Sequence, residues 1–228
     1  MTIDVFKRQV GDRAAAMVTS GTVVGLGSGS TARFATLRIA ERLRTGDLHD
    51  VLGIPTSSDT ATLAREGGIP LTTLEEHGVI DVTIDGADEV DPDWNVIKGL
   101  GGALLREKIV AYASRVEIMV VDEGKLVKRL GSKGPVPVEV LQFGWRNTFL
   151  GLEKTGARPV LRLRGERPFV TDEGNWILDC HYGPIADPET LAHRIKEIPG
   201  VVEHGLFLGM VHRVVVAGAD GVRLLEKP

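Results

Sequence analysis

The chain has 228 residues and a hydrophobic share of 43%, enough to bury a core in one large or two small domains. Its net charge of −4 gives no support for binding to nucleic acid or to an anionic membrane. The single cysteine, Cys180, excludes an intrachain disulfide and a zinc site built mainly from thiolates.

The N-terminal residues mix acidic, polar and apolar side chains and lack the apolar segment of a signal peptide. No run approaches the roughly 20 apolar residues that a transmembrane helix needs. We therefore expect a cytoplasmic protein whose partners include neither membrane nor nucleic acid.

Strands and helices alternate over the first half of the chain. Apolar spacing predicts helices over residues 4–19, 31–44 and 103–113, and a further helix that ends at Glu66. Short β-branched apolar runs predict buried strands over 22–26, 51–54, 79–84 and 116–121. This alternation is typical of an α/β protein with a doubly wound, mostly parallel sheet.

The pattern changes near Gly131, where prolines interrupt the sequence. A helix is expected over 145–154, strands over 159–164 and 175–180 with a turn at 172–175, and a helix that opens at Asp187-Pro188. These elements predict a smaller α+β domain. The apolar run 212–217 is again typical of a buried strand, and we expect it to return to the first domain.

A glycine-rich loop, Gly25-Leu-Gly-Ser-Gly-Ser-Thr31, joins a predicted strand to a predicted helix. Glycines let the backbone approach an anion, and the helix N-terminus offers N–H groups, so the loop fits a phosphate. A plain turn with a serine helix cap fits the same residues. A dinucleotide fingerprint does not, because Ser30 stands where it needs glycine, and the Gly-Lys-Ser/Thr ending of a P-loop is absent.

Two carboxylates follow the strand at 79–84, in Asp85-Gly-Ala-Asp-Glu89. Ligands of open α/β sheets bind at the carboxyl ends of strands. Asp85 and Asp88 could hold sugar hydroxyls, move protons or bind a divalent cation. The alternative is an acidic surface turn.

A second glycine-rich stretch, Lys98-Gly-Leu-Gly-Gly-Ala-Leu-Leu-Arg-Glu107, runs into the helix at 103–113. Helical spacing gives Glu107 the neighbours Ala103, Leu104, Val110 and Ala111. Such an apolar setting would raise the pKa of the carboxyl towards that of a general base. An exposed glutamate paired with Arg106 or Lys108 is the alternative.

Other polar residues give weaker signals. Lys125 follows the strand at 116–121 and could add a positive charge to the same edge, although it also fits an ordinary surface lysine. His181 is interpreted as structural. We find no spacing typical of a zinc or iron site, and Ser28 and Ser30 lack the setting of a hydrolase nucleophile.

Taken together, these loops resemble ribose-5-phosphate isomerase, type A, along almost the whole chain. The matching segments are Gly27-Ser-Gly-Ser-Thr-Ala32, Thr56-Ser-Ser58, Asp85-Gly-Ala-Asp-Glu89, Lys98-Gly with Arg106-Glu107, Pro137-Val-Glu-Val140, Ile198-Pro-Gly-Val-Val202, Gly205-Leu-Phe207 and Gly218-Ala-Asp-Gly-Val222. The chain departs from the family at Leu100, where the family has glycine, and at Gly124, before Lys125.

The resemblance implies interconversion of D-ribose 5-phosphate and D-ribulose 5-phosphate through an enediol, in the non-oxidative branch of the pentose phosphate pathway, with no metal and no cofactor. Glu107 matches the family's general base, and Lys98, Asp85 and Asp88 match polar residues around the reacting carbons. We expect the substrate-binding residues to be Ser28, Gly29, Ser30, Thr31, Gly86, Ala87, Gly99, Leu100, Gly101 and Lys125.

The family fold implied is a Rossmann-like catalytic domain, here residues 1–130 with 206–228, and a small α+β domain, here 131–205. Members form homodimers or homotetramers. Three alternatives stay open on the residues alone. They are a related sugar-phosphate isomerase or deaminase, a sugar-phosphate-sensing regulator, and a metal enzyme that uses the carboxylates of Asp85-Gly-Ala-Asp-Glu89.

Overall fold

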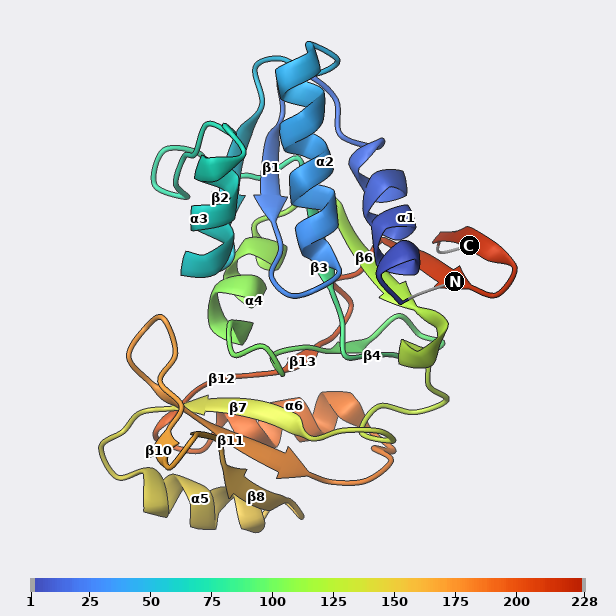
Figure 1. Ribbon diagram of the computed structural model, residues 1–228. Helices are drawn as coiled ribbons and strands as arrows, with labels where there is room; N and C mark the ends of the chain where they lie inside the picture. Colours follow the sequence, from blue (N-terminus) through green and yellow to red (C-terminus); the bar gives the residue numbers. More distant parts are fainter. Residues whose placement is uncertain (1–2, 227–228) are drawn as a thin grey trace. The chain divides into compact units, whose positions relative to one another are not determined.

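A computed structural model describes residues 3–226, and Figure 1 shows their arrangement into helices and strands. The described residues group into two units. The first unit takes those up to Ala87, Arg106–Lys125 and those from Met210, and the second takes Asp88–Leu105 and Leu126–Gly209.

The first unit contains a six-stranded sheet in the order β15-β14-β6-β3-β1-β2. Neighbouring strands pair in parallel from β2 to β14, and β15 adds an antiparallel edge. The strands are β1 (Val23–Leu26), β2 (Leu52–Pro55), β3 (Val82–Gly86), β6 (Glu117–Asp122), β14 (Arg213–Gly218) and β15 (Gly221–Glu226). The last two strands of the chain therefore complete the sheet that its first strands begin.

Helices cover both faces of this sheet. One apolar cluster joins α1 (Ile3–Ala15) and α2 (Ala32–Thr45) to Val24 and Leu26 of β1, and includes Ala64 of α3 (Ser58–Glu66). On the other face, Val110 of α4 (Leu104–Tyr112) packs with Ile54. Gly25 lies between Val24 and Leu26 and faces α4, because a Cβ there would lie 2.8 Å from Val110 Cγ1. The added Cβ would also overlap Thr83 Oγ1 of the neighbouring strand β3, so this position requires glycine.

The second unit contains a four-stranded antiparallel sheet in the order β12-β7-β11-β8. Its elements are β7 (Val136–Val140), β8 (Arg158–Leu161), β11 (Trp176–His181), β12 (Val201–His204), α5 (Trp145–Glu153) and α6 (Pro188–Lys196). Val136, Val138 and Val140 alternate along β7 and pack with apolar residues of both helices. The core of the unit therefore lies between this sheet and the two helices.

Short elements complete the unit. A three-stranded sheet pairs β4 (Glu89–Val90), β5 (Val96–Ile97) and β13 (Leu206–Phe207), and a two-stranded hairpin pairs β9 (Leu163–Arg164) with β10 (Arg167–Pro168). Among the described residues, no helix is long and apolar enough to cross a membrane.

The predicted fold class is confirmed: a doubly wound, mostly parallel sheet is accompanied by a smaller α+β unit. The division at 131–205 stays a prediction about domains. The units found here group residues 88–105 with 126–209, and β5 pairs with β13 inside that group.

Two local predictions were incomplete. The prolines concealed β7, which tolerates Pro137 because its pairing with β12 stops at Val138. The expected strand 159–164 is two elements, since β8 ends at Leu161 and β9 turns into the hairpin with β10.

Candidate active site

Asp85 stands near the end of β3 and is 1% exposed. Its Oδ1 accepts hydrogen bonds from the backbone N–H of Ser28 at 3.0 Å and of Gly86 at 2.7 Å. A Cβ at Gly27 would overlap the same carboxylate. The surface-turn interpretation is therefore wrong for Asp85, whose buried carboxylate fixes the glycine-rich loop that follows β1.

Three hydroxyl groups surround the hydroxyl of Ser28. Its Oγ lies 2.8 Å from Thr56 Oγ1, 2.7 Å from Ser57 Oγ and 3.2 Å from Thr60 Oγ1. Ser57 caps α3 by accepting the N–H of Thr60 at 3.1 Å. The Ser28 side chain is thus held at the start of α3. The sequence analysis included Thr56 to Ser58 but missed Thr60, which the Ser-x-x-Thr spacing of a helix cap could have revealed.

The rest of the loop leads into α2. Gly29 has φ +95°, a conformation that favours glycine, and Thr31 stands at the N-cap of α2 without a side-chain capping bond. The Ser30 hydroxyl accepts a hydrogen bond from Lys7 Nζ at 2.8 Å. The first N–H groups of a helix lack intrahelical partners and favour anions. This loop therefore has the backbone and the nearby cation of an anion site; Lys7, 23 residues earlier, carried no sequence signal.

Glu107 lies in the first turn of α4 and is 6% exposed. Val110 and Ala111 of the same helix are buried as well. The predicted burial of Glu107 is confirmed, and the interpretation as an exposed surface glutamate is wrong. Lys125 ends a 3-10 turn, η1 (Glu123–Lys125), directly after β6, and is half-buried.

These residues share one edge of the first unit's sheet. Ser28 to Thr31 follow β1, Asp85 and Gly86 end β3, and Lys125 follows β6. Because β1, β3 and β6 are adjacent and parallel, their carboxyl ends meet at the same edge. Ala87 directly follows β3.

The second unit holds the remaining predicted residues. Asp88 Oδ2 accepts the backbone N–H of Leu100 at 3.0 Å, and Asp88 N–H donates to Ile97 O at 2.8 Å. Lys98 is 2% exposed, and its Nζ lies 5.6 Å from the centre of the Phe207 ring. Asp88 is therefore hydrogen-bonded to the glycine-rich loop, and Lys98, which precedes that loop, has its side chain buried beside Phe207.

That loop is a turn closed by a hydrogen bond from Gly102 N–H to Gly99 O at 3.0 Å. Gly99 and Gly102 have φ +103° and +91°. Leu100 does not have a positive φ, and its side chain is exposed. The departure from glycine at this position is therefore compatible with the turn, whereas glycine is favoured at Gly99 and Gly102.

Glu89 has a different role from its two acidic neighbours. It is 2% exposed, and its carboxylate accepts the backbone N–H groups of four consecutive residues, Gly131, Ser132, Lys133 and Gly134. These contacts make Glu89 a structural anchor for the turn at residues 131–134. Within residues 3–226, no group of three or more His, Cys, Asp or Glu side chains is arranged to hold a metal ion.

Comparison with known proteins places this geometry in a family. The model of "Ribose 5-phosphate isomerase A (phosphoriboisomerase A)" matches residues 52–221. A ribose-5-phosphate isomerase A from Roseiflexus castenholzii is 53% identical over 225 residues, which cover 98% of this chain and 96% of the relative.

Solved structures agree. Ribose 5-phosphate isomerase from Plasmodium falciparum has a TM-score of 0.96 at 44% identity and covers 99% of both chains. A D-ribose-5-phosphate isomerase in complex with phospho-erythronic acid has a TM-score of 0.97 at 38% identity and covers 100% of both chains.

The chain is thus an α/β protein with buried carboxylates and a glycine-rich loop at the carboxyl ends of its parallel strands. It belongs to the ribose 5-phosphate isomerase A family.

Proposed function

We propose that this protein interconverts D-ribose 5-phosphate and D-ribulose 5-phosphate, with Glu107 as the general base. The observation that carries the proposal is the burial of Glu107 on α4 in a chain of this family. The relative solved with phospho-erythronic acid, a four-carbon acid phosphate, supports a site for a phosphorylated polyol chain.

In this proposal, the loop Ser28–Thr31 binds the phosphate. The Ser28 hydroxyl is already engaged with Thr56, Ser57 and Thr60. The phosphate would therefore be bound by backbone N–H groups of the loop that leads into α2 and by the hydroxyls of Ser30 and Thr31. Lys125 would add a positive charge.

Asp85 and Asp88 would bind the sugar hydroxyls, and Gly86, Ala87, Gly99, Leu100 and Gly101 would contact the substrate through their backbone. Asp85 Oδ1 already accepts two N–H groups and Asp88 Oδ2 accepts one. A carboxylate can accept several hydrogen bonds, and the hydroxyls of a sugar are donors.

The proposed chemistry is a proton transfer between adjacent carbons. Glu107 takes the proton from C2 of the open-chain aldose and returns it to C1. The C1 oxygen gains a proton and the C2 hydroxyl loses one, so that an enediol lies between the two sugars. Negative charge develops on the carbonyl oxygen as the proton leaves. Lys98 is buried, and a buried cation stabilises such charge more strongly than one in water.

The test replaces Glu107 with glutamine, which keeps the shape of the side chain and removes the base. We expect kcat to fall at least about 100-fold, the range typical of general acid–base catalysis, with affinity for phospho-erythronic acid largely retained. Glu66→Gln is the matched control, because Glu66 is exposed at the end of α3 in the same unit. Turnover of the Glu107 variant near that of the control would refute the assignment.

We also propose that the enzyme works as a homo-oligomer and needs neither metal nor organic cofactor. The support for self-association is the family to which the chain belongs, whose members are expected to form homodimers or homotetramers. Light scattering should give a mass of two or four chains. Activity after exhaustive chelation should equal that of the untreated enzyme, and recovery that requires a divalent ion would contradict the proposal.

A further inference from the structure

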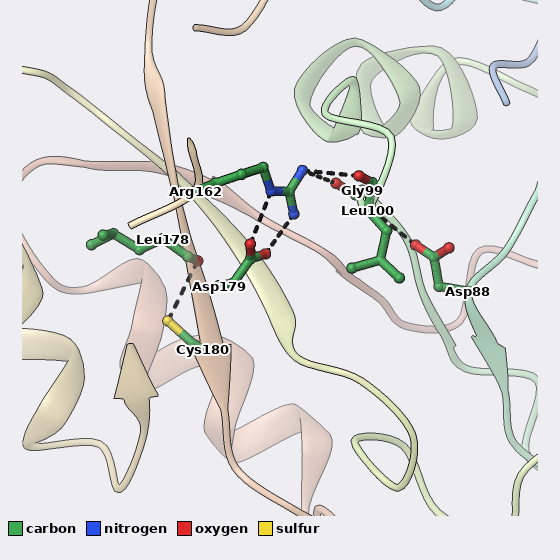
Figure 2. A network of polar contacts seen from close by, with 7 residues as sticks. All are labelled: Asp88, Gly99, Leu100, Arg162, Leu178, Asp179 and Cys180. Carbon is green, nitrogen blue, oxygen red and sulfur yellow. Dashed lines mark hydrogen bonds and ion pairs between the residues drawn. The ribbon is translucent and has the colours of Figure 1, made fainter. Parts of the chain in front are cut away.

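Arg162 connects the sheet of the second unit to the glycine-rich loop. It directly follows β8, and its guanidinium contacts both carboxylate oxygens of Asp179 on β11, with Nε 2.9 Å from Oδ2. The remaining nitrogen, Nη1, donates to Gly99 O at 2.9 Å and to Leu100 O at 3.1 Å (Figure 2). One side chain thus joins a strand carboxylate to two consecutive carbonyls of the loop.

The surroundings of Arg162 leave the side chain little freedom. Its backbone N–H donates to Ile177 O and its carbonyl accepts from Phe169 N–H, both at 2.9 Å. Its side chain is 12% exposed, and the guanidinium carbon lies 5.8 Å from the centre of the Phe169 ring. The same ring fills the position that a Cβ at Gly102 would take. The guanidinium is therefore preorganised before any ligand binds.

One peptide group of the loop is hydrogen-bonded through both its C=O and its N–H. Gly99 O and Leu100 N–H belong to the same peptide bond. The oxygen accepts from Arg162, and the N–H donates to Asp88 Oδ2 at 3.0 Å. Figure 2 shows Asp88 and Arg162 on opposite sides of this peptide. A chain of hydrogen bonds thus runs from Asp179 through Arg162 and the peptide to Asp88.

Arg162 also orients the next peptide group, between Leu100 and Gly101. Leu100 O accepts from Arg162, and in a trans peptide the N–H that follows points the opposite way. The N–H of Gly101 is therefore turned away from Arg162. Gly101 is exposed, and nothing lies within 4 Å of the position of an added Cβ.

We propose that Arg162 is a positioning residue for the isomerase reaction. It orients the Gly99–Gly101 peptides so that Asp88 is held in place and the Gly101 N–H is presented to the substrate oxygen. This inference rests on the proposed function. Arg162 itself does not contact the substrate in this proposal, since its guanidinium hydrogen-bonds to Asp179, Gly99 and Leu100.

Arginine suits this position for a physical reason. The planar guanidinium presents several N–H donors in a fixed geometry, so it can bind a carboxylate with two nitrogens and still donate from the third. A lysine ammonium has no such planar fork. Charge alone therefore does not satisfy the position.

The test compares Arg162→Lys and Arg162→Met with Arg164→Met. Arg164 is an exposed arginine of the same hairpin region, 4.9 Å from the Phe169 ring centre, and it is matched in size and in its aromatic contact. We expect kcat to fall at least tenfold in both Arg162 variants and to stay within twofold of wild type in the control. Guanidinium ion should restore part of kcat in Arg162→Gly, which a purely structural role would not predict.

A second measurement does not depend on turnover. Amide hydrogen exchange at Leu100 should accelerate at least tenfold in Arg162→Met and stay unchanged in Arg164→Met. If the wild-type protein is an active isomerase and the Arg162 variants have the same kcat as the control, the inference about Arg162 is wrong and the proposed function stands. Absence of isomerase activity in the wild-type protein would overturn the proposed function. Amide exchange would then still decide whether Arg162 orders the loop, and unchanged exchange at Leu100 would reject that role.

Discussion

The four N–H groups around Glu89 give a quantitative prediction for the stability of the second unit. Oε2 accepts from Gly131 at 2.7 Å and from Ser132 at 3.3 Å, and Oε1 accepts from Lys133 at 2.7 Å and Gly134 at 2.8 Å. In Glu89→Gln one of these oxygens becomes an NH₂ group, which cannot accept. Two bonds are lost whichever way the amide is oriented.

The size of the effect follows from this geometry. Hydrogen bonds to charged groups contribute about 1.5–3 kcal/mol each. We expect the NH₂ group of the glutamine to replace Oε2, so that the hydrogen bonds from Gly131 and Ser132 are lost. This is the weaker pair, because the Ser132 contact is the longest of the four. Because the site is buried, water cannot replace the lost bonds. We expect the free energy of unfolding of this unit to fall by about 3 kcal/mol.

Tryptophan fluorescence can follow this unit selectively. The three tryptophans, Trp94, Trp145 and Trp176, all belong to the second unit. Urea titrations of wild type and Glu89→Gln should therefore report its unfolding, with Glu166→Gln as an exposed control in the same unit, expected within about 0.5 kcal/mol of wild type. A loss below 1 kcal/mol at Glu89 would refute the assignment of its carboxylate as the anchor of the turn.

Two more predictions concern the same unit. Gly102→Ala should lower the free energy of unfolding by at least about 1 kcal/mol in urea titrations, because φ is +91° and the added Cβ would overlap the Phe169 ring. Gly101→Ala is the control, because its Cβ enters open space, and it should lower the free energy of unfolding by less than about 0.5 kcal/mol, as is usual for surface substitutions. Equal losses of stability in the two variants would contradict the overlap with Phe169. Burial, and then the charge of Asp179, raise the pKa of the Cys180 thiol. The folded protein should therefore leave a thiol reagent unreacted at pH 8, while the urea-unfolded chain reacts fully; fast labelling of the folded protein would show that the core is open.

The sequence predicted those parts of the site that depend on local pattern. Asp85 was expected at the end of an apolar strand and Glu107 on an apolar helix face, and both are buried there. The family resemblance was confirmed by the comparisons, which decide against the sensing regulator and the deaminase as the primary interpretation. The catalytic and binding roles of the individual residues stay predictions.

Residues that act across long sequence separations were missed. Lys7 reaches Ser30 over 23 positions, and Arg162 reaches Gly99 over 63. Neither stands in a motif, because their roles arise only when strands and helices are packed. Pro137 shows the opposite case, in which a local rule failed. Proline is disfavoured in strands, but β7 tolerates Pro137 because the pairing of β7 with β12 stops at Val138.

The origin of the transferred proton tests the central claim most directly. Ribose 5-phosphate incubated with the enzyme in deuterium oxide should give ribulose 5-phosphate with deuterium at C1, because a carboxylate base exchanges its proton with solvent. Glu107→Gln should slow both product formation and deuterium incorporation at least about 100-fold. Full-rate product formation without any deuterium, or unchanged incorporation in Glu107→Gln, would contradict an enediol reaction with Glu107 as its base.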